Sequence, residues 1–192
     1  MPDLFNDPPV PGLSIREEFV TPDEERELID RICAVELTPF QFRDYEGKRL
    51  THSFGWRYDF QDQSFEQAEP LPAWLHPLRE RAAAFAALDP EELGHALLIR
   101  YDPGAGIGWH KDRPVFEHVV GVSLGAATVM NFRRREGTRF QRLKLPLAAR
   151  SAYHLTGEVR HEWEHGIVAH EALRFSITFR SLSQAGRARL HA

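Results

Sequence analysis

The segment Asp102-Pro-Gly-Ala-Gly-Ile-Gly-Trp-His-Lys-Asp112 joins a glycine-rich turn to a histidine and an aspartate two residues apart. An imidazole and a carboxylate at this spacing, at the end of an extended segment, can bind one face of a metal ion. With a second histidine, His110 and Asp112 would form the two-histidine, one-carboxylate set that leaves positions on Fe(II) open for substrate and oxygen. The pair alone is weak evidence, because 10 histidines among 28 acidic residues produce such spacings by chance. The prediction therefore requires a third ligand.

Four downstream histidines are candidates for that ligand. His161 and His165 are spaced so that, on a short strand from 161 to 165, both would project from one face together with Trp163. His154 and His170 are typical of strand ends or loops. The residue pattern alone therefore leaves both His161 and His165 open.

The strand predicted over 173–180 has one apolar and one polar face. Arg174 and Arg180 are separated by an even number of residues, so both guanidinium groups project from the same face, and Ser176 lies between them on that face. A guanidinium group binds a carboxylate through two parallel hydrogen bonds, which suits a dicarboxylate ligand better than lysine would. The alternative is a surface strand with exposed arginines.

The N-terminal part of the chain predicts an extended arm, a helix and an aromatic strand. Prolines and a glycine in residues 1–12 exclude a regular element there. Thr21, Pro22 and Glu24 form a capping box that predicts a helix from about 22 to 35. Residues 38–62 mix aromatic residues with turn formers, and the aromatic residues from 54 to 60 alternate as on one strand.

A second helix is predicted from about 72 to 88, and short strands follow at intervals of about 10 residues. This order predicts an α+β fold, mainly β, in which the strands form a barrel or sandwich and the first helices cover one outer face. The predicted strands span residues 96–101, 119–124, 128–134, 139–145, 152–155, 161–165 and 173–180.

Composition favours one cytoplasmic domain. The chain has 192 residues, of which 42% are hydrophobic, and it can bury a core without disulfides. Its single cysteine excludes an internal disulfide framework, which fits a reducing compartment. Neither a charged-then-apolar leader nor an apolar run of about 18 residues is present. We therefore expect a cytoplasmic monomer with no membrane partner.

Charge is spread unevenly along the chain, whose net charge is −4. Residues 1–30 contain nine acidic and two basic residues, and residues 133–150 contain seven basic residues and one acidic residue. The basic stretch could follow a phosphate backbone with salt-sensitive affinity. The alternative, which the charge pattern supports equally well, is a hairpin whose basic side chains are only exposed to solvent.

Together, these features resemble the AlkB family of Fe(II)- and 2-oxoglutarate-dependent dioxygenases. The resemblance covers residues 95–182 closely and 40–88 more loosely. It implies a double-stranded β-helix, or jelly roll, with iron held inside one end. The motifs that follow the family's order are Tyr101, His110-x-Asp112, Gly121-Val-Ser-Leu-Gly125, Trp163-Glu-His-Gly-Ile167 and Arg174-x5-Arg180.

The resemblance also implies a role for each of these residues. It selects His165 as the third iron ligand. Arg174 would pair with the distal carboxylate of 2-oxoglutarate, helped by the hydroxyl group of Tyr101. Arg180 would lie near the carboxylate that chelates iron, and Ser176 would add a hydrogen bond.

The implied reaction uses Fe(II), 2-oxoglutarate and dioxygen to demethylate an N-alkylated base in DNA or RNA, as in DNA repair, and releases formaldehyde and succinate. Such a base must be flipped out of its stack and held by aromatic faces. Residues 38–62 would form the nucleotide-recognition lid, although a plain aromatic core is the alternative. The expected substrate contacts are Trp56 and Tyr58 with the base and backbone, and Arg57, Arg133 and Arg134 with phosphates.

The sequence departs from the family in two places. Ile99 stands where many members carry an asparagine that contacts 2-oxoglutarate, a loss on the order of 1 kcal/mol. Arg113 and Pro114 stand where the repair enzymes tend to carry an acid that reads the exocyclic amine of the damaged base. A hydroxylase of modified tRNA or of a protein side chain is therefore an alternative function. A binding module with a vestigial metal site is the non-enzyme alternative.

Overall fold

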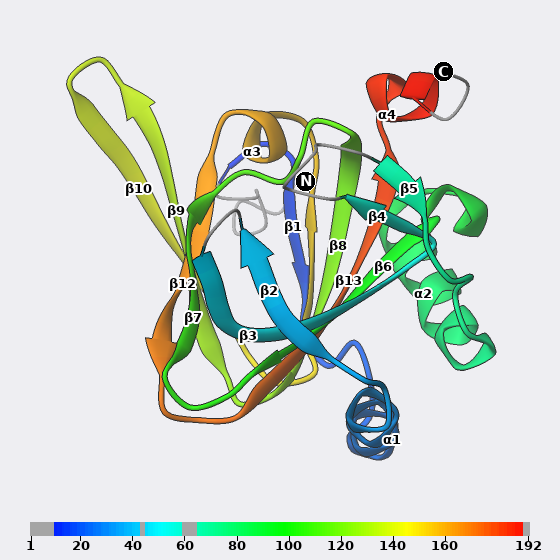
Figure 1. Ribbon diagram of the computed structural model, residues 1–192. Coiled ribbons are helices and arrows are strands. Elements are labelled where there is room, and N and C mark those ends of the chain that lie inside the picture. Colours follow the sequence, from blue (N-terminus) through cyan, green and yellow to red (C-terminus); the bar gives the residue numbers. More distant parts are fainter. Residues whose placement is uncertain (1–9, 43–44, 59–64, 190–192) are drawn as a thin grey trace, which may run out of the picture.

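The computed structural model describes residues 10–42, 45–58 and 65–189, and these residues form a mainly antiparallel β structure with helices on its outer side (Figure 1). The predicted jelly roll is confirmed. The strands are β1 (Leu13–Arg16), β2 (Thr38–Phe42), β3 (Tyr45–Phe54), β4 (Trp56–Tyr58), β5 (Phe65–Gln67), β6 (His95–Tyr101), β7 (Ala105–His110), β8 (Phe116–Gly125), β9 (Thr128–Glu136), β10 (Arg139–Leu147), β11 (Ala152–Leu155), β12 (Glu164–His170) and β13 (Arg174–Leu182). The helices are α1 (Pro22–Cys33), α2 (His76–Ala86), α3 (Gly157–His161) and α4 (Gln184–Arg189), with 3-10 turns η1 (Ala73–Leu75) and η2 (Pro90–Glu92).

Two of the sheets enclose the inner core. The larger sheet has the strand order β1-β11-β8-β13-β6-β3-β2, and the smaller has the order β10-β9-β12-β7. Buried side chains from β8, β9, β11 and β12 meet between them in one apolar cluster. The hairpin of β9 and β10 extends beyond the body of the molecule (Figure 1). Strands β4 and β5 form a separate small sheet.

Helices α1 and α2 cover the outer face of the larger sheet. Helix α1 begins at the predicted capping box, in which Thr21 and Glu24 exchange side-chain-to-backbone hydrogen bonds. Its buried residues, Leu28 and Ile32, share a cluster with apolar residues of α2 and the sheet. The apolar face of β13 belongs to this cluster, so the polar face of β13 is turned toward the inside of the barrel.

The predicted aromatic strand across residues 54–60 is wrong, because the chain turns at Gly55. Gly55 has a φ of +78°, and a Cβ there would overlap the backbone carbonyl oxygen of Gly94. Phe54 therefore ends β3 in the core, whereas Trp56 starts β4 in a different sheet. Residues 59–62 of the expected lid, and residues 1–9 of the expected arm, lie outside the described residues.

The predicted strand 161–165 is also wrong. Residues 157–161 form the short helix α3, and β12 begins at Glu164. Strands β1 and β7 were not predicted, because four residues and a glycine-rich run carry little alternation of apolar residues. No helix in the described parts of the chain is long and apolar enough to cross a membrane.

Replacing Gly55 with alanine should destabilise the fold more than replacing Gly137. Both glycines have positive φ, but a Cβ on Gly137 meets no atom within 4 Å. The Gly137→Ala change should lower the free energy of unfolding by only about 1 kcal/mol, because alanine is strained at a positive φ. The Gly55→Ala change should lower it by roughly 2 kcal/mol more, because the new Cβ also overlaps Gly94. Urea unfolding of both variants measures the difference, and equal losses would contradict the turn at Gly55.

Candidate metal and co-substrate site

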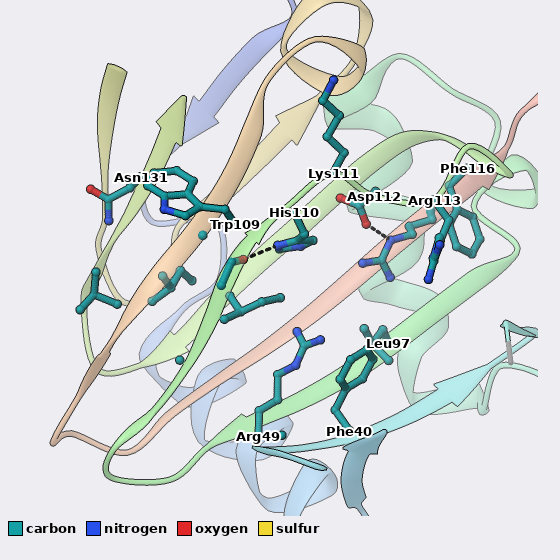
Figure 2. A pocket seen from close by; sticks show the side chains of 18 of the residues that line it. Phe40, Arg49, Leu97, Trp109, His110, Lys111, Asp112, Arg113, Phe116 and Asn131 are labelled. Atoms are coloured by element: carbon teal, nitrogen blue, oxygen red, sulfur yellow. Dashed lines mark hydrogen bonds and ion pairs between the residues drawn. The ribbon is translucent and has the colours of Figure 1, made fainter. Parts of the chain in front are cut away.

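Strand pairing brings the two predicted histidines together. In the antiparallel pair of β12 and β7, His165 lies directly opposite His110. Asp112 follows the end of β7, and the ligand atoms of the three residues lie within 4.8 Å of one another. Figure 2 shows His110 and Asp112 on the same stretch of chain at the wall of the cleft. The predicted ligand set is thus assembled.

Hydrogen bonds orient two of these ligands. His110 Nδ1 lies 2.9 Å from the carbonyl oxygen of Gly108, which acts as the acceptor, so Nε2 is left with its lone pair for a metal. Arg180 Nε donates to Asp112 Oδ1 at 2.7 Å. The other oxygen, Oδ2, lies 3.6 Å from Nε2 of His165. The protein therefore fixes one side of His110 and of Asp112, while the other side of each faces the cluster.

The ionisation states of these groups also suit a metal. Burial raises the pKa of Asp112, but Arg180 and the two histidines outweigh it and hold that pKa well below its ordinary value. Burial and the neighbouring His110 lower the pKa of His165 to about 3, and burial lowers the pKa of His110. The site thus offers one carboxylate and two neutral imidazoles, the protonation states that bind metal.

Arg174 forms the candidate carboxylate site. Its side chain is 1% exposed and its guanidinium carbon lies 4.9 Å from the ring centre of Tyr101. Nη2 donates to Ser123 Oγ at 3.2 Å, but Nε and Nη1 have no hydrogen-bond partner among the described residues. Buried donors without acceptors are costly, and a ligand carboxylate that accepts from this guanidinium group would lower that cost. The residues therefore fit 2-oxoglutarate as well as Fe(II).

A small inner pocket of about 40 Å³ connects these features. Its lining includes the metal ligands together with Tyr101, Arg174, Ser176 and Arg180. Outside it lies a cleft of about 1010 Å³, which shares His110, Asp112 and Arg180 with the inner pocket. The metal cluster thus lies where a deep polar pocket meets a wide opening.

Residues 12–180 match the family described as the 2OG-Fe(II) oxygenase superfamily. The chain belongs to this superfamily. As an oxygenase of this type it uses Fe(II), 2-oxoglutarate and dioxygen, as expected from the sequence. The match spans every residue placed above in the metal and co-substrate pockets.

Relatives of this oxygenase include AlkB-like proteins, which confirms the expected resemblance. Mouse tRNA (carboxymethyluridine(34)-5-O)-methyltransferase ALKBH8 is 31% identical over 167 residues, which cover 82% of this chain and 24% of the mouse protein. Mouse alpha-ketoglutarate-dependent dioxygenase alkB homolog 4 is 24% identical over 211 residues, which cover 91% of this chain and 69% of the mouse protein. The structure of OsALKBH1 aligns with a TM-score of 0.67 at 16% identity, covering 90% of this chain and 97% of that one. The oxygenase spans about a quarter of the length of the ALKBH8 relatives.

The alternative third ligand, His161, is excluded. It ends helix α3, where its side chain is 48% exposed, and its Nε2 lies 2.8 Å from Oε1 of Glu117. His154 lies near the end of β11, where it is buried, and its Nε2 lies 3.0 Å from Nδ1 of His118. His165 is therefore the histidine that meets the His110–Asp112 pair.

The structure places all four expected co-substrate residues in the inner pocket. Tyr101, Arg174 and Ser176 line the inner pocket as expected. Arg180 also reaches this pocket, and its Nε donates to Asp112. Ile99 contributes only an apolar wall, so no hydrogen bond replaces the family's asparagine at this position.

The expected phosphate contacts on β9 have acidic partners within the chain. Arg133 pairs with Glu164 at 2.7 Å, and its guanidinium carbon lies 4.5 Å from the ring centre of Trp109. Arg134 pairs with Glu158 at 2.7 Å and with Glu162 at 3.0 Å. Contact with phosphates stays a prediction for both arginines and would have to compete with these ion pairs.

The expected lid residues are only partly described. Trp56 is half-buried, and its ring approaches Gly94. The side chains of Arg57 and Tyr58 lie outside the described part of the chain. Base and backbone contacts by these residues stay predictions.

Two buried arginines in the cleft were not predicted from the sequence. Arg160 is 3% exposed and donates to the carbonyl oxygens of Arg113 and Phe116 at 2.6 Å and 2.7 Å, which fixes the loop that follows Asp112. Arg49 on β3 is 8% exposed and lines both the inner pocket and the cleft. In the sequence, Arg49 lies in the segment 38–62, which showed only aromatic residues and turn formers. Nothing in that pattern indicates that its side chain would be buried in the cleft.

Replacing His165 with alanine should abolish metal binding, whereas replacing His161 should not. His165 supplies one of three ligands, so its loss should weaken Mn(II) binding by more than roughly 100-fold. His161 contacts Glu117 at the surface and should leave the affinity unchanged. Calorimetric titration with Mn(II), an oxygen-stable substitute for Fe(II), measures both. Equal losses in the two variants would refute the assignment of His165.

Metal affinity should depend little on pH in the mildly acidic range. Because the pKa of His165 is lowered to about 3 and that of His110 is also lowered, neither imidazole must lose a proton to bind metal there. Mn(II) affinity measured from about pH 7.5 to about pH 5.5 should fall less than tenfold. Two unperturbed histidines would lose roughly 100-fold over this range, and such a loss would contradict their buried, neutral state.

Proposed function

We propose that this oxygenase acts on a modified base in nucleic acid, with oxidative demethylation of an N-alkylated base as the reaction to be tested first. The observation that carries the proposal is the His110–Asp112–His165 cluster beside the unsatisfied donors of Arg174, at the inner end of a cleft of about 1010 Å³. A flipped base needs a cleft that is wide enough to admit it and that leads to the metal. The AlkB-like relatives support nucleic acid as the substrate.

Bound Fe(II) and 2-oxoglutarate would supply the oxidation, in which 2-oxoglutarate and dioxygen become succinate and carbon dioxide while a substrate C–H bond is hydroxylated. The protein's contribution is positional. Arg174 holds a carboxylate, and Arg180 keeps Asp112 ionised and oriented. A hydroxymethyl group formed on a base nitrogen would be lost as formaldehyde.

An exposed aromatic and basic surface next to the metal ligands suits a single strand. Trp109, the residue before His110, is 39% exposed, and Arg133 lies over its ring. Phe140 on the protruding hairpin is also 39% exposed, and its ring centre lies 4.9 Å from the guanidinium carbon of Arg133. Bases stack on such aromatic rings while basic side chains follow the phosphates. This surface supports nucleic acid over a free small molecule.

A second candidate, hydroxylation of a modified tRNA uridine, is favoured by the charges in the cleft. Lys48, Arg49, Lys111 and Arg113 line it, and Asp112 is the one acid among the described residues of its lining. Because Asp112 is held by Arg180, no described acid of the lining is free to accept a hydrogen bond from the exocyclic amine of adenine or cytosine. The lysine and arginine side chains of the cleft instead offer hydrogen-bond donors, which suit the carbonyl oxygens of uracil. The name of the mouse ALKBH8 relative refers to a carboxymethyluridine in tRNA.

The two candidates are separated by one substrate panel. Anaerobic protein with Fe(II) and 2-oxoglutarate is exposed to oxygen with single-stranded DNA or RNA carrying N-methylated adenine or cytosine, with RNA carrying modified uridine, with a peptide pool, or with no substrate. Succinate and formaldehyde are measured, and His165→Ala serves as the inactive control. We expect succinate above the uncoupled level with at least one nucleic acid, with formaldehyde only from a methylated base.

Stimulation by the peptides and by none of the nucleic acids would overturn the proposal and favour a protein hydroxylase. Absence of succinate under every condition, including the uncoupled reaction, would favour a binding module with a vestigial metal site.

A further inference from the structure

The hairpin of β9 and β10 has two faces of opposite character. Its inward residues, which include Met130, Phe132 and Leu145, are buried in the apolar cluster between the two sheets. The residues that alternate with them point outward, away from this cluster. Six of these outward residues are polar or aromatic, and we call them the hairpin patch: Asn131, Arg133, Arg135, Phe140, Arg142 and Lys144.

The register of the hairpin concentrates positive charge on this outward face. Arg142 lies directly opposite Arg133, and Lys144 lies opposite Asn131. Like charges that face each other directly across two strands destabilise the pair. An anion bound over this face would offset that repulsion. The hairpin extends beyond the body of the molecule, where such an anion can approach it (Figure 1).

Ion pairs divide the basic residues of the hairpin into two groups. Arg133 and Arg134, the phosphate contacts expected from the sequence, already pair with glutamates of α3, β12 and the segment between them. By contrast, Arg135, Arg142 and Lys144 are exposed, and none of them forms an ion pair with a carboxylate in the described part of the chain. The charges that remain available to an external anion are therefore those of the last three residues.

Aromatic rings lie among these charges. The ring centre of Phe140 is 4.9 Å from the guanidinium carbon of Arg133 and 5.8 Å from that of Arg142. Trp109 lies on the other side of Arg133, with its ring centre 4.5 Å from the same guanidinium carbon. Both rings are 39% exposed. Exposed rings among basic side chains suit nucleic acid, because bases stack on the rings while phosphates pair with the charges. An anionic lipid surface has no bases to stack.

The hairpin patch is continuous with the cleft that leads to the metal ligands. Trp109 and Asn131 both line that cleft (Figure 2). In the smaller sheet, β12 and β9 separate β10 from β7, the strand that carries His110. Three strand spacings of about 4.8 Å place β10 about 14 Å from β7. This distance corresponds to roughly four nucleotides of a stacked strand at about 3.4 Å each. A strand whose target base enters the cleft can thus reach the patch with its flanking nucleotides.

We propose that the hairpin patch binds the phosphate backbone of the nucleotides that flank the target base, through Arg135, Arg142 and Lys144, with Phe140 as a stacking surface. Arg133 and Arg134 instead hold the hairpin on the body of the protein. The substrate is accordingly a strand several nucleotides long and not a free nucleotide. This inference rests on the proposed function in taking nucleic acid as the polymer, and it does not depend on which base is oxidised.

Direct binding of unmodified nucleic acid tests this inference. Fluorescent oligouridine and oligothymidine of about 20 nucleotides are titrated with the full chain loaded with Mn(II). Fluorescence anisotropy gives the dissociation constant at several salt concentrations. The triple variant Arg135→Gln/Arg142→Gln/Lys144→Gln should bind roughly tenfold or more weakly at physiological salt, because three phosphate contacts are lost. The slope of its affinity against salt, both on logarithmic scales, should be shallower by about 2.

A charge-matched control separates contact from net charge. The variant Arg26→Gln/Arg31→Gln/Arg187→Gln removes the same charge from exposed positions on α1 and α4. It should bind within about twofold of the wild type, because charges beyond the Debye length of about 8 Å are largely screened. Urea unfolding identifies any variant that fails to fold, and the single variant Arg142→Gln then replaces the triple variant.

A second control compares the two faces of the hairpin. Arg134→Gln should lose less affinity than Arg142→Gln, because Arg134 points inward and is held by Glu158 and Glu162. Equal losses in these two variants overturn the assignment to the outward face. Absence of oligonucleotide binding by the wild type, or an unchanged dissociation constant and salt slope in the triple variant, overturns the inference as a whole.

Phosphatidylserine vesicles test the competing partner. If the wild type binds these vesicles, and the triple variant loses the vesicles but keeps the oligonucleotides, the hairpin patch contacts lipid and the inference is overturned. A substrate panel without turnover leaves the oligonucleotide result intact. Turnover of a nucleic acid that the triple variant binds normally leaves the proposed function intact, so the two proposals fail separately.

Discussion

The ion pair between Arg180 and Asp112 is the interaction on which the site depends. It joins the loop after β7 to the inner face of β13, with side-chain exposures of 12% and 6%. A buried carboxylate would otherwise take up a proton or turn toward water, and either change would remove a metal ligand. The pair keeps Asp112 ionised and leaves Oδ2 facing His165. It also fixes the position of Arg180 in the inner pocket.

The jelly roll supplies the geometry that makes this pair possible. Strand β13 has one face packed against the helices and the other turned toward the pocket, so Arg174 and Arg180 reach the pocket from one rigid element. The pairing of β12 with β7 brings His165 to His110 from 55 residues away in the sequence. Sites held by strands rather than by mobile loops keep their ligands in place before the metal arrives. The wide cleft outside can then vary with the substrate while the oxidation site stays constant.

Residues whose chemistry and spacing are local could be predicted from the sequence. His110 and Asp112 are two residues apart, and Arg174 and Arg180 share a face on any straight strand, and the structure brings all four to one pocket. The choice between His161 and His165 could not be made from alternation, because the short helix α3 takes His161 out of the strand. Family resemblance made that choice correctly.

Arg49 and Arg160 could not be predicted, because their burial depends on contacts between segments far apart in the chain. Arg160 reaches back 44 residues to the carbonyl oxygen of Phe116, and Arg49 reaches the pocket only through the register of β3 on β6. The break at Gly55 was missed for a similar reason, since it depends on the close approach of Gly94. Alternation of apolar residues indicates which face is buried, and it does not indicate what that face meets.

A crystal structure of the chain with Mn(II) and 2-oxoglutarate tests the central claim most directly. The account predicts one metal ion bound by His110 Nε2, Asp112 Oδ2 and His165 Nε2, with one carboxylate of 2-oxoglutarate on Arg174 and the other beside the metal. A metal ion bound elsewhere, or 2-oxoglutarate outside the pocket between Arg174 and His110, would contradict it.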